Sequence, residues 1–401
     1  MLLLCIIGLL SGACQPQVLY VEVTRPVLAA TPATTPEPIA DQQVVEVTRV
    51  VTQEVTRVVT VTEQIMVEVT KAPLGTAVRP IQLLFPPTYN SAIITSRGQV
   101  LAAALAQATG HQFAVGVLDS EEALVDLMCA APADTIGFLS PLGYVLAHEQ
   151  CGAQVGNTAV AADGRTWQTG MIVTRRDSGI LTLADLADKS WAVPDLNSLP
   201  NFLYFQAMLL NEGIAPGEII TVPGDNSAML AVFNNEVEFA TATYIPPILP
   251  YAEREWVYGE DGPELWRLLG VSPTRSPIGY VLVLGEPEFG GYRLRDARSG
   301  IFDSEPGIYD QTRIITLSAQ IPNAAVAFGA DFPLTLARAV SKTLAAFATA
   351  AECVESLCAG DFYGWDGLAL ADDAAYDPLR LVVATLELAE EEIWRLTAGT
   401  Q

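Results

Sequence analysis

The chain has 401 residues, half of them hydrophobic, so it can bury one large core or two of medium size. Its 21 lysines and arginines are outnumbered by 46 aspartates and glutamates, and the formal charge of −25 repels nucleic acid and anionic membranes. The composition therefore argues against a protein that binds nucleic acid or another polyanion.

The N-terminus predicts an export signal. Residues 2–10 form an apolar run that is too short to span a bilayer but has the length of a signal-peptide core. The pentapeptide LSGAC at its end resembles the lipobox of bacterial lipoproteins, with Leu10, Ala13 and the lipid acceptor Cys14 in the expected places. We therefore predict a lipoprotein signal peptide over 1–13 and a lipid anchor on Cys14. A plain secretory signal with an incidental cysteine is the alternative.

Residues 14–78 have low sequence complexity and predict a lipid-anchored stalk or linker. The segment 31–38 is rich in proline and threonine, and the unit VTRVVT occurs at 47–52 and again at 55–60. Valines at three- and four-residue spacing favour a short coiled coil, whereas β-branched side chains favour an extended, strand-like stalk. Under both interpretations the tract is a spacer.

From Arg79 onward, strands and helices alternate, as in an α/β fold. We assign 79–173 to the first part of lobe 1. Apolar runs predict its strands at 81–85, 113–118 and 135–139. Helical periodicity predicts a helix over 99–109, another that opens after Ser120, and a third that begins at Pro141.

A second α/β unit, lobe 2, is predicted over 174–279. Its expected strands are 190–194, 218–222 and 238–244, and its expected helices are 199–212 and 226–235. The strand 280–284 is interpreted as the return crossing, so that 280–401 completes lobe 1, with an insertion over 286–312 and long helices over 332–351 and 376–396. Two α/β lobes joined by two crossings predict a bilobed clamshell with a cleft between the lobes.

Four cysteines of the predicted folded part suggest disulfides, because an even number of cysteines outside the cytoplasm favours pairing. The pairs that are local in sequence are Cys129 with Cys151 and Cys353 with Cys358. Two other pairings are formally possible, and four buried thiols are the alternative to any bond. No cysteine or histidine at zinc-ligand spacing lies near either pair.

The sequence carries no strong catalytic signature. It lacks the glycine-rich phosphate loops, the H-E-x-x-H and G-x-S-x-G motifs and the EF-hand loop. We therefore predict no catalytic residue, no cofactor and no metal site.

Polar and aromatic residues do follow the predicted strands, where open α/β folds bind ligands. Each of them is also a common turn or helix-capping residue. Free helix N-termini at such positions bind anions or carbonyl groups without a formal cation. The candidate ligand-binding residues are Tyr89, Asn90, Ser140, Tyr144, Asn197, Ser198, Asn226, Ser227 and Tyr244.

From about Pro80 to the C-terminus, the chain resembles the phosphate, phosphite and phosphonate type of ABC-transporter substrate-binding protein, which has a type II periplasmic binding fold. The segments that carry the resemblance are 178–214, 223–244, 321–347 and 376–383. The resemblance implies that Tyr89, Tyr144, Asn197, Ser198 and Asn226 contact the ligand. Asn226 stands where the family usually has histidine, which removes a possible positive charge from the site.

These observations predict a lipid-anchored extracytoplasmic solute-binding protein of an ABC importer. By the resemblance, it captures a small polar solute, of the phosphonate- or phosphite-like oxyanion class, between its lobes. Its partners would be that solute, the lipid anchor and a membrane permease, and it would act as a monomer that binds no nucleic acid. The alternatives are an extracytoplasmic enzyme and a sensory or adhesion module on the same fold.

Overall fold

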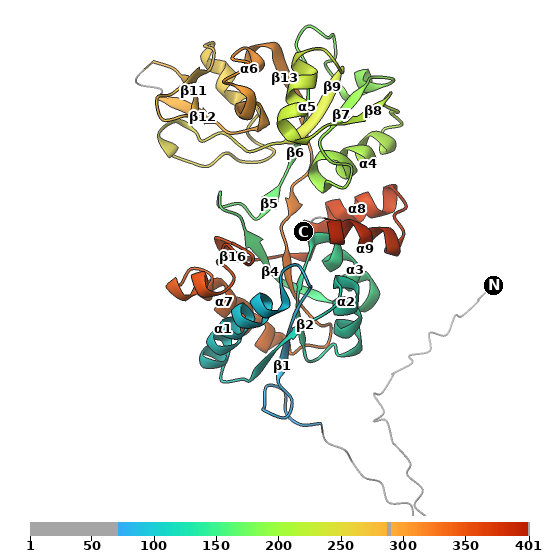
Figure 1. The fold of residues 1–401 in the computed structure, drawn as a ribbon, viewed down its shortest axis with the longest axis vertical. Helices are drawn as coiled ribbons and strands as arrows, with labels where there is room; N and C mark the ends of the chain where they lie inside the picture. The colour runs from blue at the N-terminus through green and yellow to red at the C-terminus, as the bar shows by residue number, and fades with distance from the viewer. Residues whose placement is uncertain (1–70, 287–289, 400–401) are drawn as a thin grey trace, which may run out of the picture. The chain divides into compact units, whose positions relative to one another are not determined.

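The computed structural model describes residues 71–286 and 290–399, and Pro73–Gln401 make up one compact unit (Figure 1). The predicted signal peptide, Cys14 and nearly all of the predicted stalk lie outside the described residues. Within the described part, no helix combines the length and apolar character that a membrane crossing requires.

Lobe 1 is built on a six-stranded sheet with the order β16-β4-β15-β3-β1-β2. Its strands are β1 (Ile81–Phe85), β2 (Phe113–Val117), β3 (Thr135–Leu139), β4 (Gln154–Val160), β15 (Ala325–Phe328) and β16 (Gly367–Leu370). The first three are parallel, and β15 is antiparallel to β3 and β4. The strands predicted at 81–85 and 135–139 are confirmed, and that at 113–118 ends one residue earlier.

Helices cover both faces of this sheet (Figure 1). Side chains of α1 (Ser91–Thr109) and α7 (Leu334–Phe347) share one core with Ile81, Leu83 and Phe85 of β1. Leu84 points the other way, into the core with α2 (Glu121–Ala130) and α3 (Pro141–Cys151). This alternation follows from the two-residue period of a strand, since neighbouring side chains leave opposite faces.

Lobe 2 is built on a five-stranded sheet with the order β13-β6-β9-β7-β8. Its strands are β6 (Gly170–Arg175), β7 (Trp191–Val193), β8 (Ile219–Thr221), β9 (Phe239–Thr243) and β13 (Thr312–Leu317). The helices α4 (Tyr204–Asn211) and α5 (Gly224–Phe233) follow β7 and β8. A separate three-stranded antiparallel sheet contains β10 (Thr274–Arg275), β11 (Val281–Leu284) and β12 (Gly291–Leu294).

The predicted return crossing at 280–284 is wrong, because that segment is β11 and pairs with β10 and β12. Val281 and Val283 are buried in the lobe 2 core, which holds the strand there. The segment 286–312 leads into β13 and its described residues belong to lobe 2, not to an insertion in lobe 1. Lobe 2 also begins before 174, since β6 pairs with β9 from Gly170 onward.

The two crossings pair with each other. Strand β5 (Trp167–Gln168) leads from lobe 1 to lobe 2, and β14 (Ile321–Pro322) leads back, antiparallel to it. Ile321 pairs with Gln168, and Pro322 pairs with Trp167. The predicted topology of two lobes and two crossings is therefore confirmed, and a short two-stranded ladder forms the link between the lobes (Figure 1).

Helix boundaries differ from the predictions where the backbone turns sharply. The helix predicted over 376–396 is two helices, α8 (Asp377–Thr385) and α9 (Glu390–Gly399), separated near Glu387, whose φ is 51°. α7 ends at Phe347 and a separate 3₁₀ turn follows it. α5 starts two residues earlier than predicted, because Gly224 makes the turn after β8 at a φ of 80° that favours glycine.

Both cysteine pairs chosen from the sequence are disulfide-bonded in the structure. Cys129 of α2 is joined to Cys151 at the end of α3, with Cα atoms 5.4 Å apart. Cys353 is joined to Cys358 within the turn after α7, with Cα atoms 5.1 Å apart. The first bond ties two neighbouring helices together, and the second closes a local loop.

Candidate functional site

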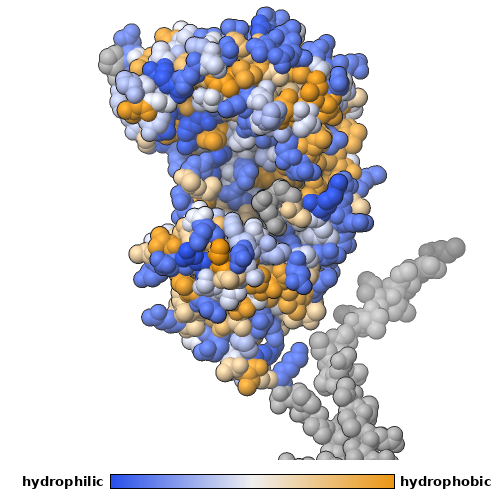
Figure 2. Space-filling view, in the orientation of Figure 1, coloured by the Kyte–Doolittle hydropathy of each residue, from blue (hydrophilic) through white to orange (hydrophobic). Residues whose placement is uncertain are grey.

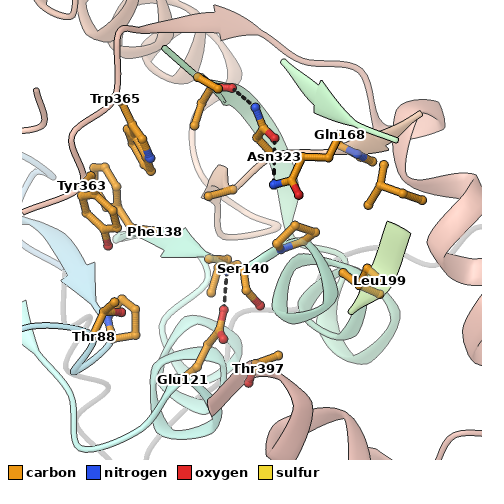
Figure 3. Close-up of a pocket in the computed structure, with 18 of the residues that line it drawn as sticks. Thr88, Glu121, Phe138, Ser140, Gln168, Leu199, Asn323, Tyr363, Trp365 and Thr397 are labelled. Carbon is orange, nitrogen blue, oxygen red and sulfur yellow. Dashed lines mark hydrogen bonds between the residues drawn. The ribbon is translucent and has the colours of Figure 1, made fainter. Parts of the chain in front are cut away.

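A cleft of about 690 Å³ lies between the two lobes at their crossings. The visible face of the molecule is hollowed in this region (Figure 2). Both lobes and both crossings line it, and Figure 3 shows how many of the side chains converge on it. The polar and aromatic lining residues are Thr88, Glu121, Phe138, Ser140, Gln168, Asp195, Ser198, Asn323, Tyr363, Trp365 and Thr397.

Two helices begin at the cleft, one from each lobe. Ser140 follows β3, and its hydroxyl accepts a hydrogen bond from the Gly143 N–H at the start of α3. Ser198 caps a π-helical turn that leads into α4, and its hydroxyl accepts from the Asn201 N–H. Both serines were predicted as ligand-binding residues, and both line the cleft.

Glu121 is a cleft residue that sequence analysis missed. It is the first residue of α2, only 6% exposed, and its Oε1 accepts a hydrogen bond from the Ser140 N–H (Figure 3). A Cβ atom on Gly143 would lie 2.2 Å from this oxygen, so any larger residue there would displace the carboxylate from its present position. Burial raises the pKa of Glu121, while the hydrogen bonds from Ser140 oppose the increase. The only signal in the sequence was an acidic first turn, which is a common feature of exposed helices.

An aromatic wall, formed by Phe138, Tyr363 and Trp365, was also missed. The rings of Tyr363 and Trp365 stack with centroids 4.3 Å apart and planes at 24°. Phe138 is 6.1 Å from Tyr363 and 6.3 Å from Trp365, with planes at 19° to both. Phe138 is the next-to-last residue of β3, but the other two lie in the irregular segment before β16, which has no periodicity from which their position could be predicted.

The side-chain amides of Gln168, in one crossing, and Asn323, directly after the other, are hydrogen-bonded to each other. Asn323 Oδ1 accepts a hydrogen bond from Gln168 Nε2 at 3.4 Å (Figure 3). Asn323 Nδ2 donates to the carbonyl oxygens of Ala159 and Arg165, at 3.0 Å each. These bonds fix the side chain of Asn323, which is 7% exposed, so that polar amide groups line the cleft at the crossings.

Asp195 contributes a carboxylate from lobe 2. It lies on the loop after β7, is exposed, and accepts a hydrogen bond from the Asn197 N–H at 2.9 Å. The cleft lining therefore includes one carboxylate from each lobe, Glu121 and Asp195. None of the described residues that line it is a lysine, an arginine or a histidine. Nor do the described residues bring three or more His, Cys, Asp or Glu side chains together in a way that could hold a metal ion.

The predicted tyrosines lie outside the cleft lining. Tyr144 is fully buried, and its hydroxyl donates to Asp373 at 2.6 Å. Tyr244 is fully buried in lobe 2 and donates to the Pro263 carbonyl at 3.1 Å. Tyr89 packs edge-on against Tyr363, with centroids 5.8 Å apart, and so supports the aromatic wall from behind the lining.

Four polar candidates make local contacts instead of lining the cleft. Asn90 caps α1 by accepting from the Ala92 N–H, and the Asn197 N–H is bonded to Asp195. Asn226 lies inside the first turn of α5, where its amide packs against Gly300 of lobe 2. The Ser227 hydroxyl donates to the Pro223 carbonyl. Of the nine predicted residues, the structure brings only Ser140 and Ser198 together at the cleft.

The comparisons with known proteins place this fold in a family. A family described as "ABC transporter, phosphonate, periplasmic substrate-binding protein" matches residues 83–376. No curated protein matches the chain.

Among solved structures, a Xanthomonas citri protein bound to ATP is similar at 12% identity and a TM-score of 0.44, covering 80% of this chain and 99% of its own. A binding protein component of an ABC phosphonate transporter from Pseudomonas aeruginosa is similar at 15% identity and 0.37, covering 82% and 94%. A Prochlorococcus marinus protein in complex with methylphosphonate is similar at 9% identity and 0.37, covering 77% and 98%.

Proposed function

The chain belongs to the family of periplasmic substrate-binding proteins of phosphonate ABC transporters, and on this premise we propose how it carries out its solute-binding role. It works outside the cytoplasm, anchored by a lipid on Cys14, with residues 14–72 as the spacer between the membrane and the folded part, which begins at Pro73. It captures a small polar solute between its lobes and presents it, as a monomer, to a membrane permease. It performs no chemistry on the solute.

The observation that carries this proposal is the cleft itself. Its walls come from two lobes that are linked by the short β5–β14 ladder, with helix starts at Ser140 on one side and Ser198 on the other. A solute that contacts both walls gains its full set of contacts only when the lobes close around it. Binding therefore favours the closed arrangement, which is the form that a permease can distinguish from the empty protein.

A thermal-shift screen of the mature protein tests the function. The panel contains phosphate, phosphite, methylphosphonate, sulfonates, organic amines and sugars. At 100 times its Kd, a solute that binds only the folded state should add about 2.7 kcal/mol to the free energy of unfolding and raise the Tm. If no solute of any class raises the Tm, the proposal fails. Turnover of a bound solute by the purified protein would favour the enzyme alternative instead.

Ser198→Ala and Asn226→Ala should separate the two predicted sites of lobe 2. Ser198 lines the cleft, so losing its hydroxyl should weaken a solute found in the screen by about two- to tenfold, equivalent to one neutral hydrogen bond. It should also cost about 1 kcal/mol of stability as a lost cap. Asn226 packs against Gly300 away from the lining, so its variant should keep the wild-type affinity.

Calorimetric titration and thermal melting of both variants check this prediction. Unchanged affinity in Ser198→Ala at a lowered Tm would mean that Ser198 acts only as a cap.

A further inference from the structure

The charges that line the cleft are unsuited to an oxyanion. Glu121 on the lobe 1 wall and Asp195 on the lobe 2 wall are both acidic, and none of the described lining residues is basic. A phosphonate between these walls would meet two carboxylates with no positive side chain to offset them, and like charges in a partly dehydrated site repel strongly. The formal charge of −25 on the whole chain adds to this repulsion and raises the local concentration of cations.

The helix starts at the cleft offer few free donors to an anion. At α3, the Ser140 N–H is bonded to the Glu121 carboxylate, the Gly143 N–H is bonded to the Ser140 hydroxyl, and Pro141 has no N–H. Glu121 thus occupies the position at this N-terminus where a bound anion would otherwise lie.

The helix start of lobe 2 is organised in the same way. The Asn201 N–H is bonded to the Ser198 hydroxyl, the Phe202 N–H is bonded to the Ser198 carbonyl, and Pro200 has no N–H. The donors that give helix N-termini their affinity for anions are therefore largely satisfied inside the protein on both walls.

The aromatic wall provides what an organic cation requires. Cations within about 6 Å of an aromatic ring centroid are attracted by the negative face of the ring, and tryptophan is the strongest partner. Trp365 and Tyr363 are stacked, partly exposed and part of the lining. Glu121 lines the same cleft as these two rings, so the carboxylate and the rings belong to one site.

We propose that the solute of this cleft is a weakly hydrated organic cation, such as an alkylated ammonium compound, held between Glu121 and Asp195 with its apolar part against the aromatic wall. This inference rests on the proposed solute-binding function and narrows its substrate class. The cation also supplies the force for closure. Without it, the carboxylates of the two lobes repel each other across the cleft, and with it, the one positive charge between them attracts both and offsets part of that repulsion.

Choline and its neutral carbon isostere, 3,3-dimethylbutan-1-ol, test the proposal as a pair that differs in charge and hardly in shape. Isothermal titration of the mature protein at pH 7 and low salt should give binding of choline, at least tenfold weaker binding of the alcohol, and no competition by methylphosphonate. Equal affinity for choline and the alcohol would overturn the proposal, as would the absence of choline binding.

Glu121→Gln should weaken choline binding by about ten- to a hundredfold, as expected for a lost contact to a charged group. Gln keeps an oxygen for the Ser140 N–H, and thermal melting verifies that the variant folds. The matched control is Glu122→Gln, which removes the same charge from an exposed position of the same helix and should leave the affinity unchanged. Asp195→Asn, on an exposed loop, is the second test variant and should also weaken choline binding.

The outcomes distinguish a failure of the cation proposal from a failure of the proposed solute-binding function. Tight methylphosphonate binding that survives Glu121→Gln would overturn the cation proposal while supporting the solute-binding function. Equal choline affinities of Glu121→Gln and Glu122→Gln would also overturn it, since the charge would then act only through the net charge of the chain. Failure of every solute in the thermal-shift screen would instead remove the function on which the proposal rests.

Discussion

Replacing Arg298 with methionine should lower the free energy of unfolding by about 3–5 kcal/mol, the cost of breaking a buried ion pair by removing one partner. Arg298 is completely buried in lobe 2. Its guanidinium donates to both carboxylate oxygens of Asp296, at 3.0 and 2.9 Å, and to Glu264 at 2.6 Å. Removing it leaves Asp296, which is 4% exposed, as a buried charge without its cation.

The same variant should also weaken the electrostatic stabilisation of the Glu264 carboxylate. Burial alone would raise the pKa of Glu264, but Arg298 and Arg267 hold the pKa below its ordinary value. The stability that Glu264 contributes is therefore present above its unfolded pKa, and it is lost as the pH falls through the lowered pKa of the folded state. Arg298→Met should weaken this contribution, so the variant should also unfold at a higher pH on acid titration.

Urea denaturation measures the effect, with Arg254→Met as the matched control. Arg254 also pairs with an aspartate, Asp261, but its side chain is 53% exposed, so its loss should change stability little. Adding Asp296→Asn to Arg298→Met removes the uncompensated charge and should recover part of the loss. Equal stabilities of the Arg298 and Arg254 variants would show that the buried pair contributes no more than a surface one.

Replacing Cys14 with serine should move the protein from the membrane fraction to the soluble fraction. The lipid on this thiol is the proposed anchor, and acyl chains contribute about 0.8 kcal/mol of membrane affinity for each buried CH₂ group. No electrostatic attraction would compensate for its loss, because a chain of formal charge −25 is repelled by an anionic lipid surface.

Fractionation of cells that express the two forms, with mass spectrometry of the N-terminal peptide, decides this prediction. Cys5→Ser is the control, because it makes the same substitution within the predicted leader and should leave the anchor intact. If Cys14→Ser stays with the membrane, or the wild-type peptide carries no lipid, the anchor is not at this residue.

Sequence patterns located the elements well where neighbouring residues decide the structure. The strands 81–85 and 135–139 follow from apolar runs, and the caps Ser120 and Ser140 follow from hydroxyl side chains that bond the amide three residues further on. The same patterns could not say which sheet a strand joins. The run 280–284 is equally apolar as a return crossing or as β11, and only its pairing with β10 and β12 places it in lobe 2.

By itself, the sequence determined an α/β chain of two lobes, with Ser140 and Ser198 at helix starts, because periodicity and capping are local properties of the chain. The return crossing at β14 was decided only by strand pairing in the folded protein. Only the tertiary structure decided the chemistry of the cleft. Glu121, Asp195 and Trp365 belong to three separate segments, and none of them has a neighbour in sequence that marks its role. Folding brings them to one cavity because the strand ends of both lobes face the same space beside the crossings. This arrangement depends on how the whole chain packs, so no local pattern predicts it.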